Sequence, residues 1–487
     1  MKKLFAGISI IVFTLSFAHI ASAETMSQDE QVIHIINRIT YGPNAETIDH
    51  VKKIGVQNFI EEQLHPENIS TPDSLSSKLS NMKTINMPLD TLVAEYGNPL
   101  QMARMDKNKD AEKDARKNSN IIVEELSQAK VERGVESNAQ LQEVLTDFWF
   151  NHFNVFAEKE RDRFYVSSYE RDAIRPYTMG RFRDLLEATA KHPAMLVYLD
   201  NWLNTDPNSR AARGKQNGIN ENYAREIMEL HTMGVDGGYT QTDVTTLAHI
   251  LTGWGLGKGK TMEEKSVFYF DPKRHDYSDK IFLGHKIRGR GEAEIEEALD
   301  ILATHPSTAH HISYQLAQNF LADQPPETLV KKMAETFTHS NGDIREVLET
   351  MFKSPEFWDK QYFRKKFKPP FRYIVSALRV TNVEADDNLI MLPALKNMGE
   401  PLYRNLTPDG FPNTNDHWVN SDALLKRIDV AKRIIKAALN TGKNVSAAEL
   451  IKVLGGDFSQ DTISAINGAG QNLQPVMVLS SPEFLYY

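Results

Sequence analysis

The stretch "ENYAREIMELHTMGVDGGYTQTDV" (residues 221–244) carries three glutamates, an arginine and a histidine before a glycine-rich turn. At about 100° per residue, positions 221–233 form an amphipathic helix, with Asn220 as the N-cap and Gly234 as a left-handed stop. The stretch therefore predicts a helix, a tight turn and a second helix that begins near Thr240. The polar arc of the first helix consists of Glu221, Asn222, Arg225, Glu226, Glu229 and Thr232, and its apolar arc of Tyr223, Ala224, Ile227, Met228, Leu230 and His231.

The polar arc admits two interpretations. Glu221 with Arg225, and Arg225 with Glu229, have the spacing of ordinary helical ion pairs, which contribute about 0.2–0.5 kcal/mol each. Alternatively, Arg225 clamps an anion and Glu226 or Glu229 acts as an acid or a metal ligand, because the preceding loop (201–220) brings basic residues to a helix N-terminus that already favours anions.

Two histidines are expected on the buried faces of different helices. His231 lies on the apolar arc of the 221–233 helix, and His152 lies on the core-facing stripe of "SNAQLQEVLTDFWFNHFNVF" (137–156). Each can be a structural core histidine, and the helix C-terminal dipole favours His231 in that role. If the two imidazoles meet, they form a candidate acid/base pair or metal site. Glu226 and His231 cannot share a metal from one helix, because such ligands need a spacing of three or four.

Apolar residues with three-and-four spacing recur along most of the chain, so the predicted fold is mainly α, a multi-helical globular body. One small β-hairpin is expected near 265–284, where two short aromatic or branched runs flank the polar loop 271–279. His275 and Asp276 in that loop are candidates for a base with its neighbour, or for a nitrogen and oxygen pair on a metal. The alternative is that the aspartates of the loop only shape turns.

The first 23 residues have the order of a signal peptide. Lys2 and Lys3 precede a largely apolar run, and Ala21-Ser22-Ala23 has the small-x-small pattern of a cleavage site. A retained membrane anchor is the alternative, but the run is short for a span and polar residues dilute it. We therefore expect an extracytoplasmic protein, periplasmic or secreted, with no membrane span after cleavage.

Composition narrows the class of function. Loss of Lys2 and Lys3 with the signal peptide takes the formal net charge from −9 to −11, which argues against nucleic acid as a partner. The 487 residues include no cysteine, which excludes disulfides, thiol nucleophiles and thiolate metal sites. "WGLGKGKT" (254–261) nearly matches a phosphate-binding loop, but Trp254 stands where that loop needs glycine and a helix precedes it. No nucleotide is therefore expected.

We expect the chain to consist of three segments: a signal peptide at 1–23, a helical core domain at 24–360 and a C-terminal helical lobe at 361–487. Residues 102–120 mix charges of both signs with few apolar side chains, and we interpret them as an exposed helix or mobile insertion without a core. Ser-Pro-Glu-Phe occurs at 354–357 and at 481–484, where serine as N-cap and proline at N1 indicate helix starts.

Several motifs occur in an order that resembles a known family. They are "DFWFNHFNV", "HPAMLVYLDN", "NENYAREIMELHTMGVDGGYTQTDV", "LTGWG", "HDYSDKIFLG" and "HPSTAHHI", followed by "PDGFP" (408–412) and Trp418. The pattern is similar to that of the domain-of-unknown-function 1800 family of exported bacterial proteins. The resemblance implies a mainly helical exported protein and a co-encoded exported partner of the domain-of-unknown-function 1501 family, but no particular reaction. It marks His152, Asn222, Arg225, Glu226, Glu229, His231, Gly234, Gly238, Trp254, His275 and Asp276.

Two functions follow as hypotheses. The first is an exported enzyme with hydrolytic or transfer chemistry on an extracytoplasmic substrate, whose site forms where three segments converge: 221–238, the end of 137–152 and the 271–279 loop. His152 or His275 then acts as the base. Glu226 or Glu229 acts as the acid or a ligand, Arg225 clamps an anion, and a divalent metal stays open as a cofactor. The second is a non-catalytic secreted binding or assembly factor that works with the co-encoded partner.

Overall fold

The computed structural model describes residues 25–214, 216–257, 259, 261–383 and 388–487. The predicted signal peptide, residues 1–23, lies outside the described residues. Within the described part of the chain, no helix has the length and apolar character needed to cross a membrane.

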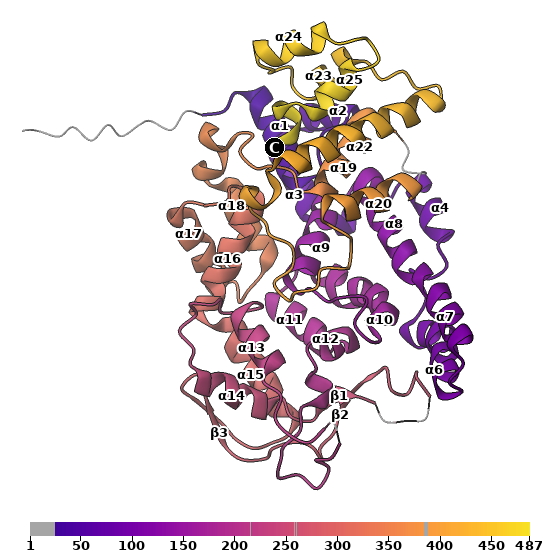
Figure 1. Cartoon of the computed structure of the whole chain (residues 1–487). Coiled ribbons are helices and arrows are strands. Elements are labelled where there is room, and N and C mark those ends of the chain that lie inside the picture. Colours follow the sequence, from indigo (N-terminus) through magenta and orange to yellow (C-terminus); the bar gives the residue numbers. More distant parts are fainter. Residues whose placement is uncertain (1–24, 215, 258, 260, 384–387) are drawn as a thin grey trace, which may run out of the picture.

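Helices dominate the described chain, which confirms the mainly α fold (Figure 1). The second helix of the 221–244 stretch begins where predicted, because Thr240 and Asp243 form a reciprocal capping box. The helices of the first half are α1 (Gln28–Ile39), α2 (Ala45–Ile54), α3 (Val56–Leu64), α4 (Asp73–Ser80), α5 (Leu89–Leu92), α6 (Asn98–Met105), α7 (Lys109–Asn118), α8 (Asn120–Glu136), α9 (Gln140–His152), α10 (Asp162–Ser168), α11 (Phe182–Lys191), α12 (Pro193–Tyr198), α13 (Asn222–Glu229) and α14 (Gln241–Ile250).

The second half is also helical after a short β region. Ser354 and Ser481, which open the two Ser-Pro-Glu-Phe tetrapeptides, each accept a hydrogen bond from the backbone N–H three residues further on, at 3.2 and 3.3 Å. Both tetrapeptides therefore begin helical turns, as predicted. The α-helices here are α15 (Glu292–Thr304), α16 (Pro306–Phe320), α17 (Glu327–His339), α18 (Ile344–Lys353), α19 (Pro370–Thr381), α20 (Asn388–Met398), α21 (Asn415–Trp418), α22 (Ser421–Asn440), α23 (Ala447–Val453), α24 (Gln460–Gly468), α25 (Gln474–Ser480) and α26 (Pro482–Leu485).

The β structure lies near the predicted place but pairs differently. β2 (Phe268–Phe270) pairs with β1 (Trp254–Leu256), and β3 (Lys280–Phe282) pairs with β4 (His285–Ile287), both antiparallel. Two small sheets in the described chain thus replace the single hairpin expected between the two runs of 265–284. The strand β3 reverses at once because Leu283 and Gly284 adopt φ angles of 47° and 80°, which suit a tight hairpin turn.

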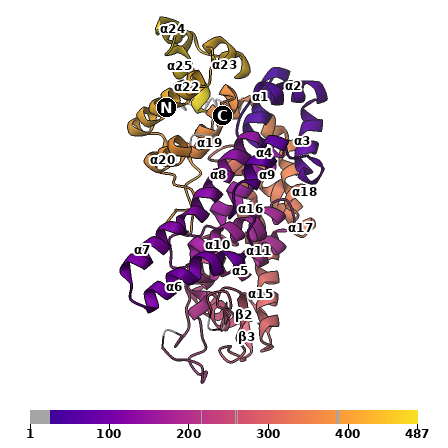
Figure 2. The same cartoon turned by 90° about the vertical axis from the view of Figure 1, so that its right-hand side faces the viewer.

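Helix α9 runs near the middle of the molecule and organises its core (Figures 1 and 2). Its Leu145 and Trp149 are fully buried, and the indole N–H of Trp149 donates to the carbonyl of Thr178 at 3.0 Å. One continuous set of buried apolar residues extends from α1 to α26, so the predicted segments 24–360 and 361–487 both contribute to it. The boundary between the two segments stays a prediction.

The helices α6 and α7 form an arm that projects from the body (Figures 1 and 2). No residue of α7 is buried, and Met102 and Met105 of α6 are exposed. Ala103 and Ser119 are the parts of this region that are buried. Most of residues 102–120 are thus exposed, and their role as an insertion stays a prediction.

Two asparagines hold the segment 399–414 against the C-terminal end of α9. The side chain of Asn151 donates to the carbonyl of Phe411 at 2.9 Å and accepts its N–H at 2.7 Å. Asn154 donates to the carbonyl of Thr407 at 2.8 Å. The two backbones approach so closely that a Cβ on Gly410, whose φ is +72°, would lie 2.3 Å from the carbonyl oxygen of Asn151. A glycine is therefore required at this crossing.

We expect Gly410→Ala to lower the free energy of unfolding by more than about 2 kcal/mol, because its methyl group meets a main-chain carbonyl at a positive φ. Gly399→Ala is the matched control, since its φ is +94° but nothing lies within 4 Å of the added Cβ. The control carries only the cost of a left-handed conformation, about 1–2 kcal/mol. Urea unfolding measures both, and equal losses would contradict a tight crossing at Gly410.

Candidate functional site

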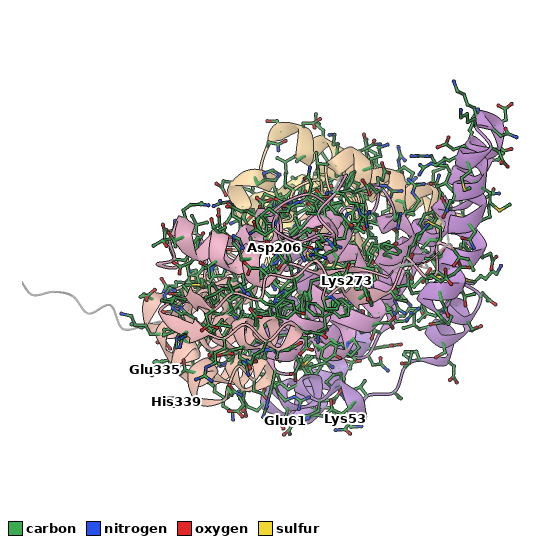
Figure 3. All side chains as sticks on the ribbon, turned by 90° about the horizontal axis from the view of Figure 1, so that it is seen from below. Lys53, Glu61, Asp206, Lys273, Glu335 and His339 are labelled. Atoms are coloured by element: carbon green, nitrogen blue, oxygen red, sulfur yellow. The ribbon has the colours of Figure 1, made fainter. Side chains whose placement is uncertain are left out.

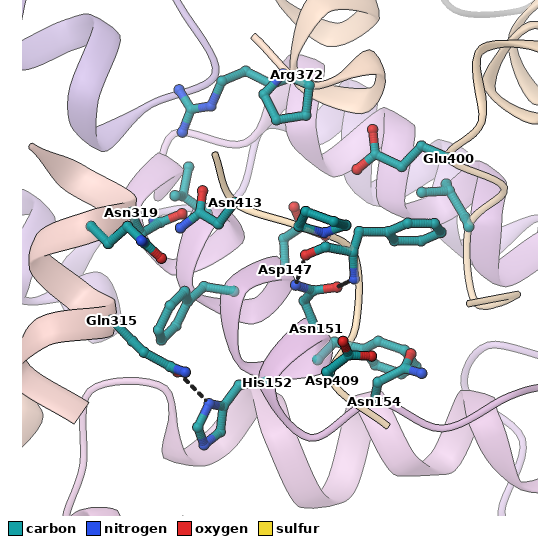
Figure 4. A pocket seen from close by; sticks show the side chains of 18 of the residues that line it. Asp147, Asn151, His152, Asn154, Gln315, Asn319, Arg372, Glu400, Asp409 and Asn413 are labelled. Carbon is teal, nitrogen blue, oxygen red and sulfur yellow. Dashed lines mark hydrogen bonds between the residues drawn. The ribbon is translucent and has the colours of Figure 1, made fainter. Parts of the chain in front are cut away.

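A cavity of about 240 Å³ lies between α9, α16 and the 399–414 segment (Figure 4). Its wall combines aromatic rings, amides and ionisable groups, and it reaches solvent at the exposed residues Asp409 and Pro412. A concave space with convergent polar groups is the usual form of a ligand site. Apart from three tyrosines, the ionisable side chains that line it are Lys130, Asp147, His152, Arg372, Glu400 and Asp409.

The 221–244 stretch borders this cavity through Leu230, but its first helix is shorter than predicted. The helix α13 ends at Glu229, whereas the sequence pattern predicted an end at Met233. The N–H groups of His231 and Met233 reach carbonyls five residues back, and the hydroxyl of Thr232 donates to a further one. These hydrogen bonds span five residues instead of the four of an α-helix, so the chain forms a wider turn here. The spacing of apolar residues in the sequence does not predict this change.

His152 and His231 meet, as the hypothesis of a paired site required. Both are buried, and their ring centroids are 6.0 Å apart. Nε2 of His152 donates to the main-chain oxygen of His231 at 3.0 Å, and Nδ1 lies 2.7 Å from the amide of Gln315. The same amide lies 3.1 Å from Nε2 of His311, whose ring centroid is 6.4 Å from that of His152. A cluster of imidazoles from α9, α16 and the turn after α13 thus forms one end of the site.

The histidines of this cluster are neutral at pH 7. Burial, with a smaller effect of His311, lowers the pKa of His152 to about 4. Burial and the two neighbouring histidines also lower the pKa of His231 well below its usual value. In the structure Oε1 of Gln315 faces Nδ1 of His152, and its NH2 group faces Nε2 of His311. A neutral His152 that donates from Nε2 accepts at Nδ1, which requires the opposite orientation of this amide.

Gly234 follows this turn and has two purposes. Its φ is +85°, so the left-handed conformation is as predicted, but α13 already ends at Glu229 and Gly234 is not its stop. A Cβ at this position would lie 2.8 Å from Nδ1 of His311, so the glycine also leaves room for the third imidazole.

The contacts of the polar arc of α13 favour the first of its two interpretations, in which its charged side chains form ordinary ion pairs at the surface. Arg225 donates to Glu221 at 3.3 Å and to Gln241 at 2.8 Å. Within the described chain, Glu229 has no ion pair with Arg225 and instead accepts a tyrosine hydroxyl at 3.3 Å. Burial, and then the charge of Glu229, raise the pKa of Glu226. Arg225, Glu226 and Glu229 are absent from the lining of the cavity.

His275 and Asp276 lie elsewhere, which corrects the predicted convergence of three segments. His275 is buried between the carbonyl of Thr252, 2.7 Å from Nδ1, and the carboxylate of Glu294, 2.9 Å from Nε2. Asp276 bonds Nδ1 of His249 at 2.7 Å. Because β2 and β3 pair with β1 and β4 rather than with each other, the loop between them packs against α14 and α15 and contributes no residue to the cavity wall.

Residues that the sequence hypothesis did not name form the other end of the cavity. Nζ of Lys130 lies 2.5 Å from Oδ1 of Asp147. The carboxyl group of Glu400 accepts the N–H of Phe371 at 2.7 Å. Aromatic rings surround the ammonium group of Lys130 with centroids 5.1–5.5 Å from Nζ, an arrangement that favours a buried cation: Phe150, Phe371 and Tyr403.

The two carboxyl groups at this end have different surroundings. Burial and the negative charge of Asp147 raise the pKa of Glu400 to about 8, so Glu400 holds its proton at pH 7. Burial disfavours the charged form of Lys130, but the charges of Asp147 and Glu170 outweigh this effect and raise its pKa. Lys130 is therefore charged and forms an ion pair with Asp147. One carboxyl group can donate a proton while its neighbour can accept one.

His152 is the one predicted site residue that lines the cavity. The other six lie outside its wall: Arg225, Glu226, Glu229, His231, His275 and Asp276. Among the residues that the structure describes, no three histidine, aspartate or glutamate side chains gather closely enough to hold a metal ion. The sequence did contain a signal for Asp147, which opens the "DFWFNHFN" motif that also contains Asn151 and His152. Glu400 has no local signal, because its burial depends on residues distant in the chain.

The described chain is a helical body with a histidine cluster and two carboxyl groups in unlike surroundings around one cavity. The chain belongs to the family described as "protein of unknown function (DUF1800)", which matches residues 34–486. The match extends over nearly the whole chain and confirms the family resemblance of the sequence motifs. Curated proteins and solved structures give no match.

The depressed pKa of His152 predicts that the protein loses stability in mild acid. In the unfolded chain His152 binds a proton below pH 6.5, its ordinary pKa, whereas in the folded protein it stays neutral down to about pH 4. The burial of neutral His152 therefore adds its full contribution to the free energy of unfolding above pH 6.5, and this contribution is lost as the pH falls towards 4. The loss amounts to at most about 3 kcal/mol. Urea unfolding between pH 7 and 4 should show a shallower decline for His152→Gln than for the wild type.

The matched control is His339→Gln, at the surface of the molecule (Figure 3). It should retain the full decline of the wild type. Parallel pH profiles for the wild type and both variants would show that His152 is not held neutral by burial.

Proposed function

We propose that this protein is an exported enzyme that performs hydrolytic or transfer chemistry on an extracytoplasmic substrate, with the cavity beside α9 as its active site. The observation that carries the proposal is that Asp147 and Glu400 line one cavity in unlike surroundings. Asp147 forms an ion pair with Lys130, whereas Glu400 is buried against the backbone N–H of Phe371. Carboxyl groups whose environments differ in this way divide the acid and base roles of a reaction.

Glu400 is the general acid and Asp147 the general base in this proposal. Glu400 is protonated at pH 7, so it can give a proton to a leaving group. Asp147 accepts a proton, and the ion pair with Lys130 orients its carboxylate. The aromatic rings around Lys130 prevent its ammonium group from moving away when the proton arrives on Asp147.

Water is the nucleophile of the hydrolytic reaction. No serine, threonine or cysteine is among the described residues that line the cavity, so the proposal includes no covalent ester with such a side chain. The water oxygen bonds to the substrate as its proton passes to Asp147, and the bond to the leaving group breaks as Glu400 protonates it. Exchange with solvent then returns a proton to Glu400 and removes one from Asp147. In a transfer reaction, a hydroxyl group of the acceptor replaces water.

The histidine cluster has a positioning role. Both ring nitrogens of His152 are engaged, one by the carbonyl of His231 and one by Gln315, so this residue has no free nitrogen for a substrate proton. Its contacts join the end of α9 to α16 and to the turn after α13. The cluster thereby fixes the helix from which Asp147 projects.

Export rests on the signal-peptide pattern of residues 1–23. A co-encoded exported protein of the domain-of-unknown-function 1501 family is the proposed partner, on the basis of the family resemblance. A binding or assembly factor without catalysis is the alternative that the following experiment distinguishes.

The test uses the purified exported protein with a panel of chromogenic nitrophenyl esters, phosphates, sulfates and glycosides. We expect turnover of at least one member, with a decline above about pH 8 as Glu400 loses its proton. Glu400→Gln and Asp147→Asn should each lower kcat by roughly 100-fold or more, because each removes one proton-transfer group. Glutamine can still accept the N–H of Phe371, so the fold around residue 400 should be retained.

Glu124→Gln and Asp114→Asn make the same chemical changes at exposed positions outside the cavity, and they should leave turnover unchanged. Absence of turnover across the panel, or full turnover by both cavity variants, would overturn the enzyme proposal and favour the assembly factor.

A further inference from the structure

One arginine in the cavity wall has no carboxylate partner. Arg372, near the start of α19, is 7% exposed and lines the cavity. Its Nη1 donates to the main-chain oxygens of Asn37 and Thr40, at 2.8 and 2.7 Å. Both acceptors are neutral, and Arg372 has no ion pair among the described residues. A buried cation without a counter-ion is unfavourable, so an anion that enters the cavity stabilises this side chain.

The guanidinium group of Arg372 has one unused edge. Of its five N–H groups, those on Nη1 bond the two main-chain oxygens. The rings of Tyr487 and Tyr41 have centroids 4.3 and 5.4 Å from its Cζ. Nε and Nη2 have no hydrogen-bond partner among the described residues, and protein atoms do not enclose them. The edge from Nε to Nη2 is therefore open to a ligand in the cavity.

Three arginines in the core beside α19 differ from Arg372 in this respect. All three side-chain nitrogens of Arg379 donate to protein oxygens. Arg38 and Arg427 each have side-chain nitrogens without a hydrogen bond, but protein atoms enclose those nitrogens. Arg372 instead combines accessible, unbonded nitrogens with a position in a cavity wall. This combination indicates a ligand contact more than a purely structural role.

The other ionisable groups of the wall do not compensate this positive charge. Lys130 and Asp147 neutralise each other as an ion pair. Glu400 and His152 are uncharged at pH 7, because burial raises the pKa of the first to about 8 and lowers that of the second to about 4. Asp409 is exposed at the rim. The enclosed part of the cavity therefore favours an anion.

A single guanidinium edge favours a carboxylate over a phosphate. The parallel N–H groups of Nε and Nη2 match the two oxygens of a carboxylate and its single charge. A phosphate monoester has a charge of about −1.5 to −2 at pH 7 and three strong acceptor oxygens, which one guanidinium does not satisfy. The cavity volume of about 240 Å³ is below the roughly 300–1,000 Å³ of sites for drug-sized ligands. The carboxylate therefore belongs to a small molecule.

We propose that the cavity binds the carboxylate group of a small organic acid on the Nε–Nη2 edge of Arg372, and that this acid is the substrate of the proposed enzyme. The role as a substrate rests on the proposed function, whereas the binding does not. In the view of Figure 4, Arg372, Asn319 and Asn413 lie on one side of the cavity and Glu400 lies on the other. A ligand anchored at Arg372 thus extends across the cavity towards the proposed acid.

Binding is tested with the purified exported protein by calorimetry and saturation-transfer NMR, with acetate, benzoate and phenylacetate as probes. Acetamide, benzamide and phenylacetamide are the neutral comparators of the same shape, and inorganic phosphate and phenyl phosphate are the comparators of higher charge. We expect at least one carboxylate to bind at least about tenfold more tightly than its amide and than either phosphate.

Two variants test the contact with Arg372. Arg372→Lys retains the positive charge but lacks the paired N–H groups, so it should weaken carboxylate binding by about tenfold or more. Asn413→Asp adds a carboxylate that competes for Arg372, and it should weaken binding to a similar degree. The side chain of Asn413 has no hydrogen bond within the described chain, so the unfolding midpoint of this variant should stay that of the wild type. Arg288→Lys and Asn118→Asp make the same changes at exposed positions outside the cavity wall and should bind as the wild type does.

Failure of every carboxylate to bind, equal binding of carboxylates and their amides, tighter binding of phosphate, or unchanged affinity of both cavity variants contradicts the inference. Carboxylate binding that depends on Arg372, without turnover of any chromogenic substrate, overturns the enzyme proposal alone. Turnover that depends on Glu400, in a protein that binds none of the carboxylates, overturns the carboxylate inference alone.

Discussion

The paired hydrogen bonds between the Asn151 side chain and the main chain of Phe411 are the contact on which the site depends. A primary amide donates and accepts at once, as a peptide group does, so it holds the 399–414 segment in a single register on α9. Glu400 and Asn413 reach the cavity from the two ends of that segment. Aspartate at position 151 would lack the donor, and a smaller apolar residue would lack both groups.

Two buried glutamates near Lys130 show how local partners decide protonation. Glu170 accepts the hydroxyl of Tyr403 at 2.6 Å, and its oxygen lies 3.5 Å from Arg175. Burial favours its neutral form, but Lys130 and Arg175 outweigh burial and lower its pKa. Glu400 is buried to a similar degree with one N–H donor and an adjacent negative charge, so its pKa moves in the opposite direction. Lys130 lowers the pKa of both groups, so the difference between them comes from Arg175 beside Glu170 and from Asp147 beside Glu400.

Features that depend on residues close together in the sequence were predicted correctly. The start of α14 at the Thr240 box, the left-handed Gly234 and the burial of His152 and His231 were all predictable from spacing. The end of α13 was not, because the bonds that widen the turn after Glu229 compete with the helix without any change of pattern. The strand pairing at 254–287 was not predictable either, since each run can pair with several others of equal length.

The sequence by itself determined the mainly helical class, the faces that turn inward and the family, because each of these follows from residue types at fixed spacing. Tertiary structure alone decided that His152 stands with His231 and His311 while His275 joins Glu294 elsewhere. It also decided that Glu400 is an acid, since a pKa is set by burial and by charges from α8 and α9, which lie far from Glu400 in the chain. Distances between such groups exist only once the helices are packed.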